Sequence, residues 1–153
     1  MTVKEIFLDQ FSANYDESGW FVSLKQALKG LSEDEASWKA NESTNSIHGI
    51  MSHLIYYNQE YLAKFNGETP HPELNPAHNN DTFHALSSWE DTIKDLDAIM
   101  TRWKEDIQAT SEEQLNDWAK ELSNITQHMA YHIGQIVQIR KQQQSWNPEQ
   151  GVS

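Results

Sequence analysis

Long stretches of this chain carry apolar residues three and four positions apart and contain no proline. The four prolines stand at positions 70, 72, 76 and 148, so the segments on either side of 66–80 are free of this helix breaker. The pattern is clearest in the series Leu86, Trp89, Ile93, Leu96, Met100, Trp103 and Ile107. Such spacing aligns apolar side chains along one face of a helix and predicts an all-α fold.

Helix-capping signals divide this pattern into separate segments. A serine followed three positions later by Glu, Asp or Gln marks a helix start at Ser32, Ser88 and Ser111. Glycine favours the position just after a helix, and Gly30 and Gly67 stand at two such ends. The expected helical segments are 3–28, interrupted at 16–19 and resumed at Trp20, a short turn over 32–38, and helices over 46–65, 86–107 and 111–139.

Four amphipathic helices in a chain of 153 residues have one economical arrangement. The length suits a single domain, and no internal repeat suggests a solenoid. We therefore predict an all-α four-helix bundle that forms one domain over residues 1–153. The polar stretch 66–80 is longer than a helix hairpin needs, so we expect a long crossover connection there.

Charge and residue content exclude several classes of function. Lys and Arg number 11 against 23 Asp and Glu, and the net charge of −12 repels nucleic acids and anionic membrane surfaces. Cysteine is absent, which rules out disulfides, thiolate metal ligands and a cysteine nucleophile. Because no apolar stretch approaches about 20 residues, we expect a cytoplasmic protein with neither a membrane partner nor a nucleic-acid partner.

Two histidines four residues apart, His128 and His132, stand in the last helical segment. This spacing places both imidazoles on one side of a helix, close enough to hold one metal ion. His53 flanks the apolar seam of the 46–65 segment in the same way, so three imidazoles from two helices are candidates for one open metal centre. Periodicity alone does not select the third ligand, because that helix widens its apolar face toward His48, about 140° away from His53.

These histidines also have simpler explanations. A chain with seven histidines contains such a pair by chance, and the pair then serves as a solvated or hydrogen-bonded feature at a bundle edge. The pattern lacks the glutamate of a His-Glu-x-x-His helix, so protease-like hydrolysis is not supported. His71, His78 and His84 lie in or beside the polar connection, and we expect them to be solvated.

Two stretches carry a resemblance to a known family. Residues 46–60, which include His53, and residues 128–136, His-Met-Ala-Tyr-His-Ile-Gly-Gln-Ile, together resemble the DinB-like superfamily, which includes YfiT-type metal-dependent proteins. The likeness covers nearly the whole chain. It implies a four-helix bundle that binds a divalent metal ion through His53, His128 and His132. It also implies a homodimer, as in many members of the superfamily.

Further residues are candidates for the surroundings of this metal. Similar sequences often have Trp where this chain has His48, which we expect to be a packing residue; the alternatives are a pocket-lining group or an acid or base behind the ligands. Gln135 resembles the glutamine of the family's Gly-Gln pair and would fix an imidazole tautomer, while Gly134 would permit close helix approach. Tyr57 and Tyr131 either line a cavity or are half-buried bundle residues.

The resemblance implies two functions. In the first, the chain is a metal-dependent enzyme, a thiol S-transferase or a hydrolase-like enzyme, in which Zn²⁺ or Ni²⁺ activates a low-molecular-weight thiol or water for reaction with a small-molecule substrate. The likeness extends to bacillithiol S-transferases and mycothiol-dependent isomerases, which favours the thiol. The alternative is a non-catalytic metal-binding stress-response or structural bundle protein. A plain interaction module with unligated histidines ranks third.

Overall fold

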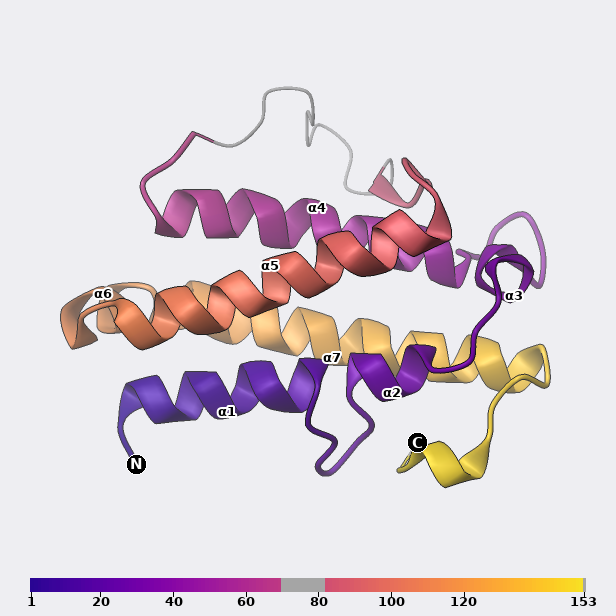
Figure 1. The fold of residues 1–153 in the computed structure, drawn as a ribbon, viewed down its shortest axis with the longest axis horizontal. Helices are drawn as coiled ribbons and strands as arrows, with labels where there is room; N and C mark the ends of the chain where they lie inside the picture. Colours follow the sequence, from indigo (N-terminus) through magenta and orange to yellow (C-terminus); the bar gives the residue numbers. More distant parts are fainter. Residues whose placement is uncertain (70–81, 153) are drawn as a thin grey trace. The chain divides into compact units, whose positions relative to one another are not determined.

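The computed structural model describes residues 1–69 and 82–152. Within these residues all assigned secondary-structure elements are helices. Its elements are α1 (Val3–Tyr15), α2 (Leu24–Leu28), α3 (Glu33–Ser37), α4 (Ile47–Phe65), α5 (Trp89–Ala109), α6 (Glu112–Asp117), α7 (Ala119–Gln142) and a 3-10 helix, η2, over Pro148–Gln150 (Figure 1). The all-α prediction is confirmed. Most of the expected crossover, 66–80, lies outside the described residues.

Local signals in the sequence set several helix starts and ends. Four serine hydroxyls accept a hydrogen bond from the backbone N–H three positions later, at 2.9 to 3.1 Å; these are Ser32, Ser46, Ser88 and Ser111. Such a bond satisfies a backbone donor that the helix itself leaves unpaired. Gly30 and Gly67 adopt φ values of 74° and 69°, the left-handed conformation that glycine supplies after a helix.

The prediction of helical, buried positions from the apolar pattern is wrong at several residues. Trp20 lies outside the helices and is 98% exposed, because the chain re-enters a helix only after the Ser23 cap. Leu86 precedes α5 and is 76% exposed, and Ile93 on α5 is 40% exposed. The segment predicted as one helix over 111–139 divides at Trp118, whose φ of −96° and ψ of 2° depart from helical values.

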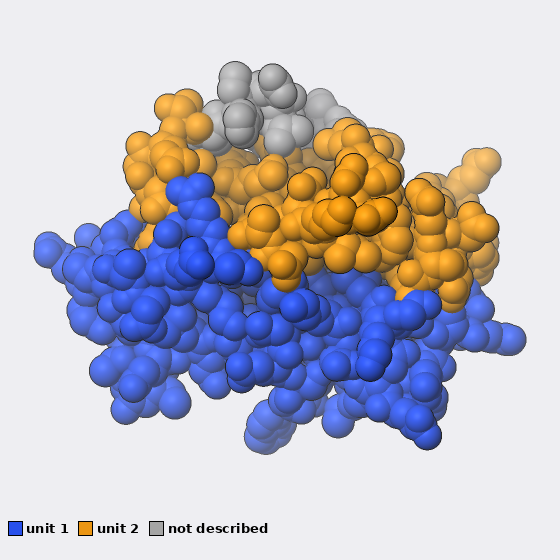
Figure 2. Space-filling view, in the orientation of Figure 1, with its two compact units in different colours: residues 1–30, 100–153 blue, residues 31–99 orange. Residues whose placement is uncertain are grey.

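The chain forms two compact units, coloured separately in Figure 2. Unit 1 comprises Met1–Gly30 and Met100–Ser153, and unit 2 comprises Leu31–Ile99. Helix α5 begins in unit 2 and continues into unit 1. This division leaves the prediction of a single domain over 1–153 undecided, and that prediction stays open.

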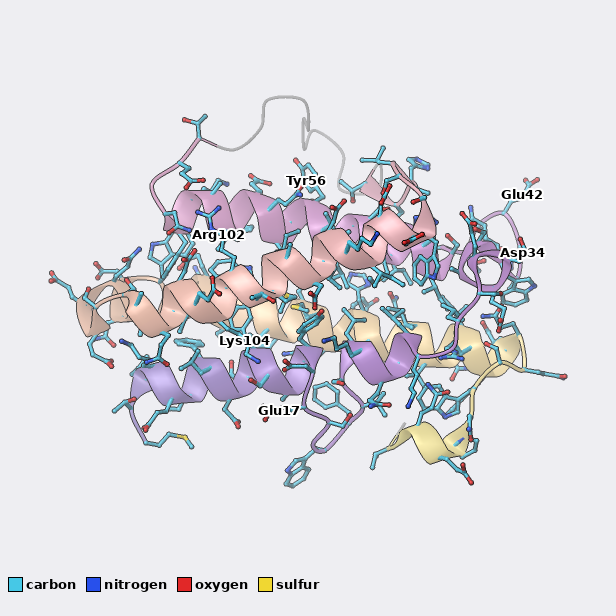
Figure 3. All side chains as sticks on the ribbon, in the orientation of Figure 1. Glu17, Asp34, Glu42, Tyr56, Arg102 and Lys104 are labelled. Atoms are coloured by element: carbon cyan, nitrogen blue, oxygen red, sulfur yellow. The ribbon has the colours of Figure 1, made fainter. Side chains whose placement is uncertain are left out.

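In unit 1, α7 packs against α1 and α2, and α6 packs against α1. The rings of Phe11 and Trp103, both fully buried, lie 5.4 Å apart between centroids. On α5, Lys104 Nζ lies 3.0 Å from Asp16 Oδ1 just after α1, and Figure 3 labels this lysine. This core therefore contains an aromatic pair, with an ion pair at its edge.

In unit 2, α3 packs against α4. Helix α4 buries most of its length, and four of its buried side chains are polar: His48, Ser52, His53 and Asn58. Buried polar groups require partners, and Asn58 Nδ2 donates to Leu54 O at 2.9 Å. No helix in the described part of the chain combines the length and the apolar character that crossing a bilayer requires.

Candidate metal centre

Helix α7 brings His128 and His132 together in unit 1. They stand one turn apart, with their Nε2 atoms separated by 3.0 Å and their ring centroids by 4.6 Å. Two nitrogens bound to one tetrahedral ion at about 2.0–2.1 Å would lie about 3.3 Å apart. The pair therefore has nearly the separation that two ligands of one ion require. His132 is buried, at 4% exposure, and His128 is half-buried.

Both imidazoles of the pair favour the neutral form. The pKa of His128 is lowered to about 4, mainly by burial and to a smaller extent by the neighbouring His132. Burial also lowers the pKa of His132, while its hydrogen bond to Gln135 acts in the opposite direction. Neutral imidazole is the form that binds a metal ion, so the surroundings favour the ligand form without deprotonation by the metal.

Gln135 fixes the orientation of the His132 ring. Its Oε1 lies 2.7 Å from His132 Nδ1, and its Nε2 donates to the Tyr131 hydroxyl at 3.1 Å. An amide oxygen accepts, so the His132 proton resides on Nδ1 and the lone pair on Nε2. Tyr131 is 64% exposed, and its ring lies edge-on to the buried His132 ring at 5.0 Å between centroids.

His53 occupies the middle of α4 in unit 2 and is 5% exposed. Its Nδ1 lies 2.6 Å from Thr82 Oγ1, and its ring stacks on Phe83 at 4.0 Å with the planes 9° apart. The Tyr57 ring meets it edge-on at 4.9 Å. The threonine hydroxyl can donate or accept, so the contact occupies Nδ1 of His53 and leaves its Nε2 as the nitrogen for an ion.

The supports of His53 were missed by sequence reasoning. Thr82 and Phe83 fall between the polar connection 66–80 and the segment predicted as a helix over 86–107, and nothing in the sequence links them to α4. Gly49 is part of the explanation, because a Cβ placed there would lie 2.8 Å from the Phe83 carbonyl oxygen. The glycine thus permits the 82–83 backbone to approach α4 closely enough for the ring contact with His53.

His48 points in another direction on α4 and has its own partners. Its Nε2 lies 2.9 Å from Thr92 Oγ1, and its ring meets Trp89 edge-on at 5.2 Å. Burial lowers its pKa, with the Glu33 carboxylate raising it to a smaller extent. The structure thus pairs His48 with α5 residues through packing and a hydrogen bond, the first of the roles considered for it.

The remaining candidates are less informative. His84 is exposed, as expected for a solvated residue, whereas His71 and His78 lie outside the described residues. Tyr57 is half-buried, and burial, followed by the neighbouring Tyr56, raises its pKa. Gly134 is exposed, and a Cβ built on it would meet no atom within 4 Å. The expectation of a close helix approach at Gly134 is therefore wrong for the described residues.

The donor chemistry fits a divalent metal ion. In the part of the chain that the structure describes, His53, His128 and His132 form the group of three ligand-type side chains that permits metal binding. With no cysteine in the sequence, the set is entirely imidazole nitrogen, which suits Zn²⁺, Ni²⁺ and Cu²⁺. At His53 and His132, a hydroxyl or amide oxygen also stands at the second ring nitrogen, a common arrangement around bound metals.

Comparison with known proteins gives one family. The sequence model described as the DinB superfamily matches residues 22–136, a region that contains all three of these histidines. No curated protein matches the sequence.

Proposed function

The chain belongs to the DinB superfamily, and from that membership we propose that it is a metal-dependent enzyme whose ion is bound by His53, His128 and His132. The observation that carries the proposal is the donor set, three imidazoles that together permit metal binding. Two of them have lowered pKa values and so favour the neutral ligand form. Gln135 supports the tautomer in which Nε2 of His132 carries the lone pair, and Thr82 occupies Nδ1 of His53, which leaves Nε2 of His53 for the ion.

The proposed reaction is thiol transfer. A divalent ion such as Zn²⁺ or Ni²⁺, when bound, supplies a Lewis acid that lowers the pKa of a thiol or water. Because the chain has no cysteine, the sulfur comes from a low-molecular-weight thiol cosubstrate. The sulfur bonds to an electrophilic carbon of the small-molecule substrate, the leaving group departs with the electron pair of its broken bond, and the thiol proton passes to solvent. The resemblance to bacillithiol S-transferases and mycothiol-dependent isomerases favours a thiol over water as the nucleophile.

The alternative is a metal-binding protein without turnover. His53 lies on α4 and the histidine pair on α7, so a single ion bound by all three would link two helices that are distant in sequence. An ion that binds only the folded state stabilises it, and stress-response or structural proteins use metals in this way. The two functions differ in whether loss of the ion changes activity or only the melting temperature.

Metal content is the first test. Chain prepared without a histidine tag, exposed to Zn²⁺ or Ni²⁺ and washed free of loose ions should retain one metal per chain by mass spectrometry of the elements. His132→Ala should lose most of it, whereas the control His84→Ala removes an exposed imidazole and should retain it. A parent protein that holds no metal, or a His132→Ala variant that holds as much as the parent, would contradict the proposal.

Activity and melting separate the enzyme from the structural alternative. We expect metal-dependent consumption of thiol with a panel of electrophiles, in the presence of bacillithiol, mycothiol, coenzyme A or glutathione. If His132→Ala loses the metal and the activity but melts like the parent, the ion serves chemistry. Silence with all four thiols, together with a large fall in melting temperature on metal removal, favours the structural function.

We also propose that the chain works as a cytoplasmic homodimer with no nucleic-acid or membrane partner. The net charge of −12 supports the absence of nucleic-acid and anionic-membrane partners, because it opposes binding to phosphate groups, whereas the dimer follows from the resemblance alone. Light scattering should give twice the mass of one chain, and a gel shift at low salt should show no complex with DNA. A monomeric mass or tight DNA binding would contradict the corresponding part.

A further inference from the structure

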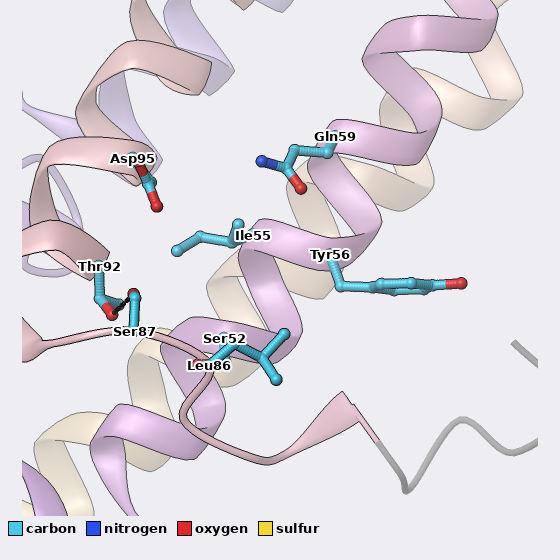
Figure 4. Close-up of a pocket in the computed structure, with 8 residues that line it drawn as sticks. All are labelled: Ser52, Ile55, Tyr56, Gln59, Leu86, Ser87, Thr92 and Asp95. Atoms are coloured by element: carbon cyan, nitrogen blue, oxygen red, sulfur yellow. Dashed lines mark hydrogen bonds between the residues drawn. The ribbon is translucent and has the colours of Figure 1, made fainter. Parts of the chain in front are cut away.

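A pocket of about 230 Å³ lies in unit 2, between the middle of α4 and the first turns of α5 (Figure 4). Its walls carry both polar and apolar side chains. Those that matter here are Ser52, Ile55 and Gln59 from α4, Leu86 and Ser87 from the segment before α5, and Asp95 from α5. The volume suits a small organic molecule.

The pocket uses a different face of α4 from the one that carries His53. Ser52, Ile55 and Gln59 recur at spacings of three and four, and His48 stands one turn before Ser52, so all four share one stripe of the helix. His53 is rotated about 100° from Ser52 around the helix axis. The pocket is therefore a site separate from the histidine ligand on this helix.

Three polar groups of the pocket have no partner among the described residues. The Asp95 carboxylate, the Gln59 amide and the Ser52 hydroxyl take part in no hydrogen bond or ion pair with any residue of 1–69 or 82–152. Figure 4 shows the side chains of Asp95 and Gln59 extending into the space between α4 and α5. Ser52 as a whole is 8% exposed. Asp95 and Gln59 are exposed, so water solvates them in the free protein, and a ligand that displaces this water must offer groups of matching charge and hydrogen-bonding type.

A hydrogen-bond chain prepares a further acceptor at the pocket wall. The Thr92 hydroxyl donates to Ser88 O at 2.9 Å, which uses its one proton. Its oxygen therefore accepts from His48 Nε2 at 2.9 Å and from the Ser87 hydroxyl at 3.0 Å. The Ser87 proton is directed to Thr92 Oγ1 at 3.0 Å or to Ser88 O at 3.4 Å, so Ser87 Oγ presents lone pairs to a ligand. Ser87 therefore acts toward a ligand as a hydrogen-bond acceptor, as the Asp95 carboxylate does.

We propose that this pocket binds a small molecule carrying a primary amine. The ammonium group donates to the Asp95 carboxylate and to Ser87 Oγ, with the Gln59 carbonyl oxygen as a further acceptor. The short carbon chain of the ligand covers Ile55 and Leu86, the latter 76% exposed without it. A carboxylate or phosphate ligand would be repelled by Asp95, and a purely apolar one would leave the polar walls without partners.

The test is a titration of the full ¹⁵N-labelled chain with n-butylamine, followed by NMR in the presence of a chelator. Saturable shifts should appear in amides of residues 52–59 and 86–95. Asp95→Asn keeps the shape and removes the charge, and it should weaken binding about ten-fold, the loss of one charge-assisted interaction. Asp97→Asn makes the same change on the same helix outside the pocket and should bind like the parent. Both positions are exposed, so neither change threatens the fold.

Matched ligands and a second variant complete the test. n-Butanol has the same chain without the charge and should bind at least about ten-fold more weakly than n-butylamine. Ser87→Ala should also weaken amine binding. The proposal is overturned if n-butylamine causes no saturable shifts, if Asp95→Asn binds as the parent does, or if n-butanol binds equally well. Because the chelator removes metal throughout, these outcomes are independent of the metal-binding proposal.

Discussion

Gly49 and Gly134 show how differently two helical glycines are used in the same chain. A Cβ on Gly49 would lie 2.8 Å from Phe83 O and 3.2 Å from Ser46 Oγ, whereas one on Gly134 would meet nothing within 4 Å. The first glycine permits a backbone approach, and the second only exposes helix backbone. Both stand inside helices, so sequence position alone does not distinguish them.

Replacement by alanine should therefore have opposite effects at the two sites. Gly134→Ala should raise the free energy of unfolding by about 0.5–1 kcal/mol, the gain in helix propensity. Gly49→Ala should lower it by about 1–3 kcal/mol, because the crowded Phe83 carbonyl belongs to backbone. Urea unfolding of the two variants measures both values. If Gly49→Ala were as stable as Gly134→Ala, the close approach of the 82–83 segment would be refuted.

His48 should make stability depend on pH in a defined direction. Burial lowers its pKa in the folded protein below the unfolded value of about 6.5. Between those two values the unfolded chain binds more protons, so the contribution of His48 is present above about pH 6.5 and is lost as the pH falls through the lowered folded pKa. The neighbouring Glu33 carboxylate opposes this shift without reversing it.

His48→Gln provides the matched comparison, since glutamine keeps a donor for Thr92 but does not titrate. The free energy of unfolding of the parent minus that of the variant should decrease as the pH is lowered from about 8 to about 5. Urea unfolding across this range measures it. Taking the difference cancels the titration of the other histidines. A difference that is constant or rises toward acid would contradict the assignment.

At the scale of elements, the Arg140 side chain connects the end of α7 to the end of α2 through hydrogen bonds. It is 3% exposed, and its Nη1 donates to Ala27 O at 2.7 Å and to Lys29 O at 2.8 Å, while Nη2 donates to Ser145 O at 2.7 Å. Its guanidinium also lies 5.7 Å from the Trp146 ring centre. Carbonyls at a helix C-terminus carry partial negative charge, which suits a buried cation.

Arg140→Ala should therefore lower the free energy of unfolding by about 3 kcal/mol, because several charge-assisted bonds are lost and buried carbonyls are left unpaired. Lys141→Ala removes the adjacent exposed cation and should change it by less than about 0.5 kcal/mol. Chemical unfolding monitored by circular dichroism distinguishes the two. Equal, small effects would show that Arg140 contributes no more than a surface charge.

At the scale of the whole molecule, α5 is common to both units. It runs from Trp89 to Ala109, and the boundary between the units falls after Ile99, in the middle of the helix. A helix cut near its centre loses the hydrogen bonds that span the cut, so neither unit keeps all of its helical structure alone. This continuity favours the single domain expected from chain length.

The chain should consequently unfold in one transition. Tryptophan fluorescence and far-ultraviolet circular dichroism should give the same urea midpoint, as two-state unfolding requires. The tryptophans occur in both units, for example Trp89 in unit 2 and Trp103 in unit 1, so separate unfolding would be visible. Two distinct midpoints in the metal-free protein would contradict a single cooperative domain.

The sequence by itself determined the helical class, most helix starts and the pairing of His128 with His132. These depend on neighbours within a few residues, where the helix repeat and the serine caps act directly. The same local reasoning was wrong at Trp20 and at Trp118, where one pattern continued across a break in the chain.

Only the tertiary structure decided which residues surround the candidate ligands. Thr82 and Phe83 support His53, Thr92 pairs with His48, and a pocket forms beside Asp95. Thr92 stands 44 residues from His48, and no period in the sequence spans that distance. Such contacts arise because packing brings distant segments together, and the fit of side chains and backbone at each contact selects the partners.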